Sequence, residues 1–168
     1  SIPGRKYTDI RRDFYLEKLI KRKSNGLIKV ITGIRRCGKS YLLNNIFYHH
    51  LLDSGVEADH IIRFAFDSAD DLYLIGESLK IEKEKRVVDP EKFMAYIRSK
   101  TTGEGIYYLL LDEIQMLDCF EAVLNGYLRK ENIDVFVTGS NAKLLSKDIT
   151  TEFAGRGDEI HMYPLSFA

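Results

Sequence analysis

The chain has 168 residues, of which 45% are apolar and 30% charged, and this composition suits one domain with its own hydrophobic core. The 25 basic and 25 acidic residues cancel, so the overall charge gives no reason to expect nucleic acid or an anionic membrane as a partner, although a local basic patch stays open. No apolar run approaches the roughly 18 residues of a membrane span, no signal peptide is visible, and two cysteines make no disulfide framework. We therefore expect a cytoplasmic domain with reduced thiols and no membrane contact.

Hydrophobic patterns divide the chain into alternating strands and helices. Residues 1–26 predict a polar, basic lead-in with one helix, and residues 27–168 predict the core of the domain. Within that core we expect strands at 27–32, 61–66, 106–111, 133–138 and 159–163, and helices at 39–52, 90–100 and 120–128. Asp89 and Pro90 supply an N-cap and a first-turn proline for the second of these helices. Residues 67–88 have no clear period, so we expect a helix fragment followed by a surface connection there.

The order of these elements predicts the fold class. The run at 106–111 (IYYLLL) is continuously apolar, as is typical of a strand that is buried on both faces. Strands that alternate with helices favour a parallel sheet with helices on both faces. We therefore predict an α/β three-layer sandwich around a central, mostly parallel, five-stranded sheet. Ligands of such sheets bind at the carboxyl ends of the strands.

Residues 33–40 carry the motif on which the functional prediction depends. They read GIRRCGKS and match the phosphate-loop pattern G-x-x-x-x-G-K-[ST] at each fixed position, between a predicted strand and a predicted helix. Lys39, which we expect to face solvent, would bind the β- and γ-phosphates, and the Ser40 hydroxyl would bind Mg²⁺. The expected nucleotide contacts in this stretch are Gly33, Ile34, Arg35, Arg36, Cys37, Gly38, Lys39, Ser40 and Tyr41. The sandwich is therefore predicted to be a P-loop NTPase that binds ATP with Mg²⁺.

Two carboxylates follow the apolar strand at 106–111. Asp112 is the expected Mg²⁺ ligand, directly or through water, and Glu113 is the expected general base that polarises the attacking water. A glutamate directly after the aspartate favours the ATP-hydrolysing branch of P-loop proteins with an inserted central strand. The sequence lacks the N-K-x-D motif of small GTPases, and it lacks the arginine-rich lid of nucleotide kinases.

Three further features have both a functional and an ordinary interpretation. Ser140 or Asn141 follows a predicted strand and could contact the γ-phosphate as a sensor, or could simply form a polar turn. Arg156 lies between two glycines, so we expect it to be exposed and mobile. It is either an arginine finger that acts on a neighbouring subunit's ATP or a solvated loop residue. Arg35 and Arg36 could face phosphate, a partner or solvent, and the sequence does not choose between these.

The four histidines do not predict a metal site. His49 and His50 are adjacent, and His60 and His161 stand alone. Since metal-binding histidines usually come at spacings that converge on one face, we expect these side chains to be solvated and no metal-ligand cluster to form.

Taken together, four segments resemble the prokaryotic AAA-type ATPases of the archaeal-ATPase-like group. These segments are GIRRCGKS, YYLLLDEIQ, VFVTGSNAKLL and EFAGRGDEIHMYPLSF, and the resemblance extends over residues 10–167. It implies nucleotide and Mg²⁺ ligands at Lys39 and Ser40, a Walker B pair at Asp112 and Glu113, and a sensor at Ser140. Arg156 matches the G-R motif of the group, but Gly157 replaces a commoner hydrophobic residue. Members typically carry a variable C-terminal domain, so we expect this chain to be truncated before one.

The favoured function is an ATPase whose nucleotide state is coupled to a conformational change. The alternatives are a slow-turnover switch and a DNA-associated helper ATPase. Self-association or a protein partner is compatible with each of these, and the sequence leaves nucleic acid open as a partner. The residues identify neither the process that ATP would drive nor a side chain that recognises adenine.

Overall fold

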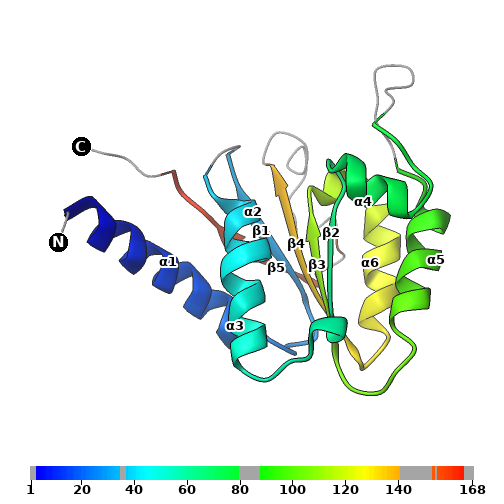
Figure 1. The fold of residues 1–168 in the computed structure, drawn as a ribbon, viewed down its shortest axis with the longest axis horizontal. Coiled ribbons are helices and arrows are strands. Elements are labelled where there is room, and N and C mark those ends of the chain that lie inside the picture. Colours follow the sequence, from blue (N-terminus) through cyan, green and yellow to red (C-terminus); the bar gives the residue numbers. More distant parts are fainter. Residues whose placement is uncertain (1–2, 35–36, 80–87, 141–152, 154, 165–168) are drawn as a thin grey trace.

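The computed structural model describes residues 3–34, 37–79, 88–140, 153 and 155–164 (Figure 1). The strands are β1 (Ile28–Gly33), β2 (Ile61–Ala65), β3 (Tyr107–Asp112), β4 (Ile133–Ser140) and β5 (Gly157–His161). The helices are α1 (Pro3–Lys21), α2 (Lys39–Tyr41), α3 (Tyr48–Asp53), α4 (Ala69–Leu74), α5 (Pro90–Lys100) and α6 (Phe120–Leu128). A π-helical stretch, Leu42–Phe47, joins α2 to α3, and short 3-10 turns lie at Ala58–His60 and Ile114–Met116.

The five strands form one sheet in the order β2-β3-β4-β1-β5, and each neighbouring pair is parallel. The α/β prediction is confirmed, although the sheet is entirely rather than mostly parallel. The last strand begins two residues earlier than predicted, because Gly157 already pairs with Ile28. Of the ambiguous stretch 67–88, the expected helix fragment is α4, and residues 80–87 lie outside the described part of the chain. The predicted cap of α5 is present, since the Asp89 carboxylate accepts the Glu91 N–H at 2.9 Å.

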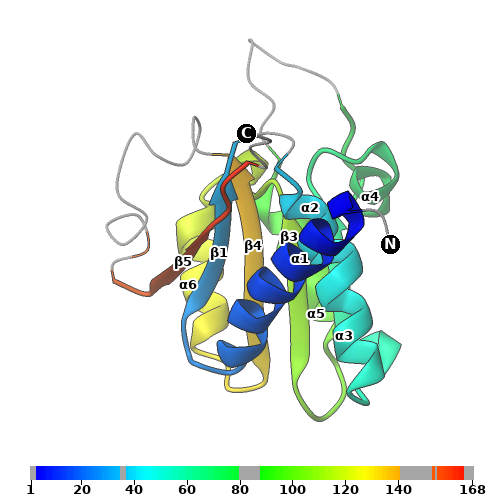
Figure 2. The same cartoon turned by 90° about the vertical axis from the view of Figure 1, so that its left-hand side faces the viewer.

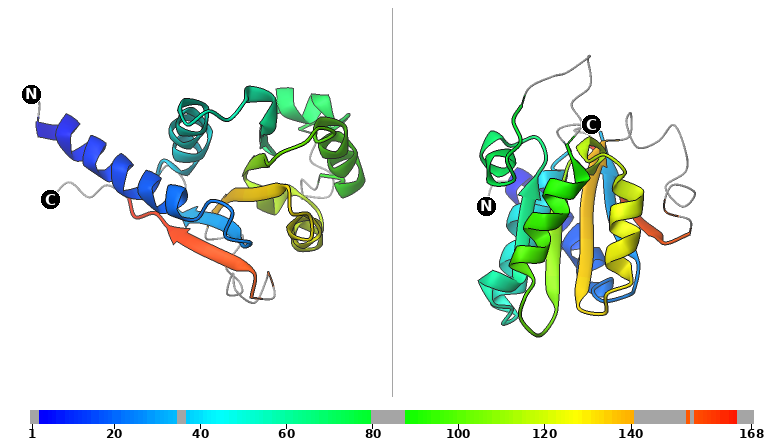
Figure 3. Two further views of the ribbon diagram at one scale, coloured as in Figure 1. Left: turned by 90° about the horizontal axis from the view of Figure 1, so that it is seen from below. Right: turned by 90° about the vertical axis from the view of Figure 1, so that its right-hand side faces the viewer.

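Apolar side chains form one core on each face of the sheet. On the first face, α1 and the helical stretch 39–53 contribute Leu19 and Phe47, among others, and Figure 2 shows α1 beside α2 and α3. On the second face, α4, α5 and α6 contribute Leu72, Phe93 and Leu124, and the right panel of Figure 3 shows α5 and α6 covering the strands. The three-layer sandwich is therefore present. In the described residues, every helix is too short or too polar to cross a membrane.

The central strands β1 and β3 are buried along their whole length, in agreement with their apolar sequence pattern. All residues of β1 and β3 are buried, as expected for strands covered on both faces, whereas the edge strands β2 and β5 are partly exposed. Because all strands are parallel, their carboxyl ends meet at one edge of the sheet. Gly33, Asp112 and Ser140 are the last residues of β1, β3 and β4, so the predicted site residues converge there.

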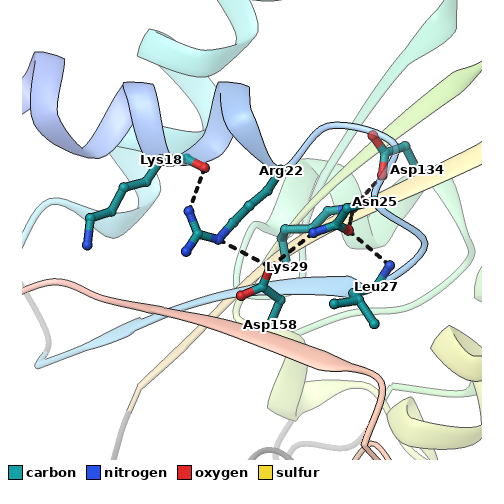
Figure 4. A network of polar contacts seen from close by, with 7 residues as sticks. All are labelled: Lys18, Arg22, Asn25, Leu27, Lys29, Asp134 and Asp158. Carbon is teal, nitrogen blue, oxygen red and sulfur yellow. Dashed lines mark hydrogen bonds and ion pairs between the residues drawn. The ribbon is translucent and has the colours of Figure 1, made fainter.

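A buried ion pair anchors the turn between α1 and β1 (Figure 4). The Lys29 ammonium on β1 donates to Asp134 Oδ1 of β4 at 2.5 Å, and both side chains are at least 95% buried. Lys29 also donates to Asn25 Oδ1 at 3.2 Å, and the second oxygen of Asp134 accepts the Ser24 N–H at 2.8 Å. Burial lowers the pKa of Lys29, while the carboxylate of Asp134 acts in the opposite direction. A lysine in a fully buried strand was not foreseen, because the pattern at 27–32 predicts only apolar burial.

The same turn reaches the edge strand β5. Arg22 Nε lies 3.1 Å from Asp158 Oδ2, and the Asn25 amide donates to the same carboxylate at 3.0 Å. A second arginine nitrogen donates to the Lys18 carbonyl within α1 at 3.0 Å (Figure 4). The end of α1 is therefore tied to β1, β4 and β5 at the end of the sheet opposite the phosphate loop.

Candidate functional site

The phosphate loop lies between β1 and α2, at the carboxyl edge of the sheet. Gly38 has a φ of 95°, a conformation that favours glycine. Gly33 has a φ of 149°, and a Cβ there would lie 2.6 Å from the Met162 carbonyl oxygen and 2.7 Å from Cys37 Sγ. The motif glycines are therefore required by the backbone itself. Ile34 is exposed, and Arg35 and Arg36 lie outside the described residues.

Lys39 does not face solvent, which corrects the prediction for this residue. It is 95% buried, and its ammonium donates to the carbonyl oxygens of Gly33 and Ile34 at 3.0 and 2.9 Å. A buried ammonium requires acceptors, and the loop curls around the side chain so that its own backbone supplies two of them. Cys37 Sγ is 4.0 Å from the same nitrogen. The charge of Lys39 is therefore held inside the loop rather than beside it.

Ser40 and Asp112, separated by 72 positions, are in direct contact. The Ser40 hydroxyl lies 2.9 and 2.7 Å from the two carboxylate oxygens of Asp112. Asp112 is 96% buried at the end of β3. A hydroxyl and a carboxylate that meet in this way are hard oxygen donors, the kind that Mg²⁺ prefers. The two predicted metal ligands therefore fit a magnesium ion.

Thr138 is a site residue that the sequence analysis missed. It is fully buried on β4, its Oγ1 donates to Asp112 Oδ1, and it accepts the Glu113 N–H at 3.0 Å. The signal that could have identified it is a hydroxyl residue near the carboxyl end of a buried strand, where β4 runs beside β3. The sequence-based prediction for this segment named only Ser140 and Asn141, which follow the predicted strand.

Glu113 follows Asp112 in a left-handed conformation with φ 58°. Its carboxylate accepts a hydrogen bond from the Gln115 side-chain amide, and its backbone N–H bonds to Thr138. The side chain is half-buried, so a water molecule can approach it. Gln115 had no assigned role, although it belongs to the quoted motif. The predicted base is thus held by two side chains, one from its own turn and one from the neighbouring strand.

Of the remaining predicted contacts, Ser140 lies next to the phosphate loop and Tyr41 lies next to α1. Ser140 is paired in register with Gly33, so it lies beside the start of the phosphate loop, whereas Asn141 lies outside the described residues. Tyr41 is exposed on α2, and the Arg12 guanidinium of α1 lies 4.9 Å from its ring centroid. Tyr41 therefore contacts α1 on the side of the loop, while Ser140 borders the loop itself.

Arg156 lies at the other end of the sheet. Its carbonyl accepts the Ile28 N–H at 2.8 Å, and its own N–H donates to the Phe153 carbonyl at 3.0 Å. The side chain is exposed, and these two bonds join the backbone of Arg156 to β1 and to Phe153. Strand β1 extends from Ile28 to Gly33, which separates Arg156 from the loop by roughly 17 Å at about 3.3 Å per residue. The side chain therefore cannot serve the site of its own chain.

The structure also brings together three potential metal-ligand groups, of which only His60 was considered from the sequence. Glu57, Asp59 and His60 have ligand atoms within 4.8 Å of one another, beside a pocket of about 550 Å³ between β2 and the end of α5. This corrects the expectation that His60 stands alone. One ring nitrogen is 2.9 Å from Asp59 Oδ1 and the other 2.8 Å from the Glu104 carbonyl oxygen, so each ring nitrogen faces an acceptor. The contacts with Asp59 and with the Glu104 carbonyl raise the pKa of His60, and they occupy both ring nitrogens.

The chain is similar in sequence to a known protein family and to several curated proteins. A family model described as an AAA domain matches residues 25–168. An uncharacterized protein of Haemophilus influenzae is 38% identical over 160 residues, which cover 94% of this chain and 36% of that protein. An uncharacterized protein of Methanocaldococcus jannaschii is 33% identical over 162 residues, covering 94% of this chain and 30% of the relative. The chain thus spans about a third of the length of these relatives.

Solved structures share the fold at low sequence identity. The structure of Drosophila ORC bound to DNA superposes with a TM-score of 0.55 at 15% identity, covering 90% of this chain and 89% of that one. The structure of Drosophila ORC bound to AT-rich DNA and Cdc6 gives 0.57 at 14% identity, with coverage of 99% and 61%. A DNA polymerase III gamma subunit-related protein of Thermotoga maritima gives 0.51 at 9% identity, with coverage of 88% and 44%. These likenesses concern the architecture alone.

Proposed function

Since the chain belongs to the AAA domain family, we propose that it binds ATP with Mg²⁺ and hydrolyses it, coupling nucleotide state to a conformational change. The observation that carries this proposal is the contact between Ser40 and Asp112 at 2.9 and 2.7 Å. The two residues come from motifs 72 positions apart in the sequence, and each motif by itself predicts a Mg²⁺ ligand. Residues 27–168 form the proposed ATPase core, and residues 1–26 its lead-in.

Each side chain at the carboxyl edge has a separate role in this proposal. The backbone of residues 33–41 holds the phosphates, and Lys39 exchanges its two carbonyl acceptors for phosphate oxygens. Ser40 and Asp112 hold the Mg²⁺ ion, which neutralises phosphate charge when bound. Ser140, beside Gly33, is the proposed sensor of the γ-phosphate.

Glu113 is the proposed general base. It takes a proton from water while the water oxygen bonds to the γ-phosphorus, and the bond from that phosphorus to the bridging oxygen breaks to give ADP and phosphate. This requires the Glu113 carboxylate to leave the Gln115 amide or to share it with the water. The half-buried position of the side chain is compatible with either arrangement.

Variants of Lys39 and Glu113 separate nucleotide binding from turnover. Lys39→Ala removes the only ammonium described in the loop and should abolish ATP binding measured by calorimetry, whereas Lys130→Ala, at an exposed position after α6, should bind as the parent does. Glu113→Gln should bind ATP with parental affinity and hydrolyse it about a hundredfold more slowly, because the amide cannot accept the proton. Unchanged ATP affinity in Lys39→Ala would refute the site. A parent that binds ATP tightly but turns over slowly even in a single-turnover experiment would instead be a nucleotide switch.

Arg156 enters the proposal only between subunits. It is exposed and remote from its own loop, so a catalytic role requires a neighbouring chain. Specific ATPase activity should then rise with protein concentration, and Arg156→Ala should remove that rise without weakening ATP binding. Mixing Arg156→Ala with Glu113→Gln should restore part of the activity, since each variant supplies the group that the other lacks. Flat specific activity, with Arg156→Ala equal to the parent, would leave Arg156 as a surface residue.

A further inference from the structure

We propose that Thr138 is a positioning residue that fixes Asp112 and Glu113, here called the Walker pair, relative to each other. The inference rests on the proposed ATPase function and deepens it. Thr138 itself would touch neither nucleotide nor metal. It would act by holding the metal ligand and the base in one arrangement.

A single hydroxyl joins the two members of the Walker pair. Thr138 Oγ1 uses its proton to donate to Asp112 Oδ1, and it uses a lone pair to accept the Glu113 N–H at 3.0 Å. Leu111 is paired in register with Val137, which places the next residues of β3 and β4 side by side. Thr138 is fully buried, so water cannot replace either bond. A hydroxyl group can donate one hydrogen bond and accept another at the same time, whereas valine, which has nearly the same size as threonine, can do neither.

The two bonds constrain different parts of the Walker pair. The bond to Asp112 fixes the orientation of the carboxylate from the side of β4, while the Ser40 hydroxyl approaches the same carboxylate from α2. The bond from the Glu113 N–H supports a backbone with φ 58°, a conformation that is unfavourable for a residue with a Cβ. Without Thr138 the Glu113 backbone is free to relax, and its carboxylate would move with it. Asp112 would also lose a hydrogen bond to a charged group, which belongs to the stronger class of such bonds.

The test compares three variants of the complete chain. Thr138→Val keeps the volume and removes both bonds, whereas Thr138→Ser keeps the hydroxyl. Thr32→Val is the matched control, because Thr32 is equally buried on β1 but its hydroxyl donates to Glu159 at 2.7 Å instead of to the Walker pair. If Thr138→Val does not fold, Thr138→Ala takes its place.

Three measurements separate positioning from packing. The first is hydrogen exchange of the Glu113 amide by NMR without nucleotide, which should be about tenfold or more faster in Thr138→Val, because its buried acceptor is lost. The second is the Mg²⁺ concentration that gives half-maximal nucleotide binding, which should rise about tenfold. The third is kcat, which should fall by about tenfold or more with little change in KM for ATP. Thr138→Ser should restore all three, and Thr32→Val should lose thermal stability while leaving the Glu113 amide and the Mg²⁺ requirement unchanged.

The outcomes distinguish this inference from the function on which it rests. A parent protein that binds no ATP in the presence of Mg²⁺ overturns the proposed function and this inference together. A parent that binds and hydrolyses ATP, with Thr138→Val equal to it in Glu113 exchange and Mg²⁺ requirement, overturns the role of Thr138 alone. Equal losses in Thr138→Val and Thr138→Ser also overturn it, because serine keeps the hydroxyl and a loss shared by both variants therefore cannot come from removing it.

Discussion

Breaking the ion pair between Lys29 and Asp134 should destabilise the domain strongly, and removing both partners should not. The two side chains are 99% and 95% buried, so either charge left alone has no water to solvate it. Removing one partner of a buried pair typically costs about 3–5 kcal/mol, whereas replacing both by apolar residues is often neutral or stabilising. Lys29→Met and Asp134→Leu should each lower the free energy of unfolding by that amount. In a domain of this size the loss corresponds to roughly 10 °C in Tm.

The assay is a double-mutant cycle measured by urea unfolding at neutral pH, followed by far-UV circular dichroism. We expect a coupling energy of about 3 kcal/mol or more for the buried pair, insensitive to salt because screening acts weakly on buried charges. Lys92 and Glu77 form a matched control pair on the surface, 3.4 Å apart with 47% and 21% of the side chains exposed. Their cycle should give about 1 kcal/mol or less, and less still at high salt. Single effects at Lys29 and Asp134 that add within about 0.5 kcal/mol would refute the reasoning, since additivity means that neither charge depends on the other.

Three further predictions concern single residues. Gly33→Ala should lose about 1–3 kcal/mol of stability in urea together with ATP affinity, because its Cβ would lie 2.6 Å from the Met162 carbonyl oxygen, and parental values for both would contradict the fitted loop. Tyr127→Phe should be neutral or stabilising by about 1 kcal/mol in the same assay, since the buried hydroxyl has no hydrogen-bond partner within the described residues, and a clear loss would reveal a partner. The hydrogen bond to Asp59, and after it the one to the Glu104 carbonyl, raises the pKa of His60. The protonated ring should therefore stabilise the fold fully below the ordinary pKa of 6.5, and this stabilisation should disappear as the pH rises through the raised pKa. NMR titration and urea unfolding across that range check this, and a His60 pKa at or below 6.5 would contradict it.

The fold was largely predictable from the sequence because its signals are local. The continuous apolar run that became β3, the Asp89 cap of α5 and the glycine pattern of the phosphate loop each report a physical requirement of nearby backbone. The boundaries of β5 were missed because Gly157 joins the sheet through its pairing with Ile28, not through any propensity of its own. Which residues of two distant strands pair with each other cannot be predicted from the residue types at those positions.

The candidate site was predictable only where a motif fixes the residue type. Ser40 and Asp112 follow from such motifs, whereas Thr138 becomes recognisable only when β4 is known to lie beside β3. Lys39 was placed in solvent because sequence gives no account of a loop that wraps around its own lysine. The distance of Arg156 from the loop likewise depends on the direction of β5, which only the pairing with β1 supplies.

At Glu113 the left-handed backbone lowers the stability of the fold, while the side chain is the proposed catalytic base. A residue with a Cβ pays roughly 1 kcal/mol for a conformation that glycine adopts freely, so Glu113→Gly should make the folded domain more robust while deleting the proposed base. A selection for heat or protease resistance alone would accept that substitution and enrich for chains that lack the proposed base. Conversely, glutamate is expected to be retained at this position, despite its lower stability, where selection acts on turnover. Evolution experiments that test the proposed function therefore need a selection for ATP hydrolysis as well as for folding.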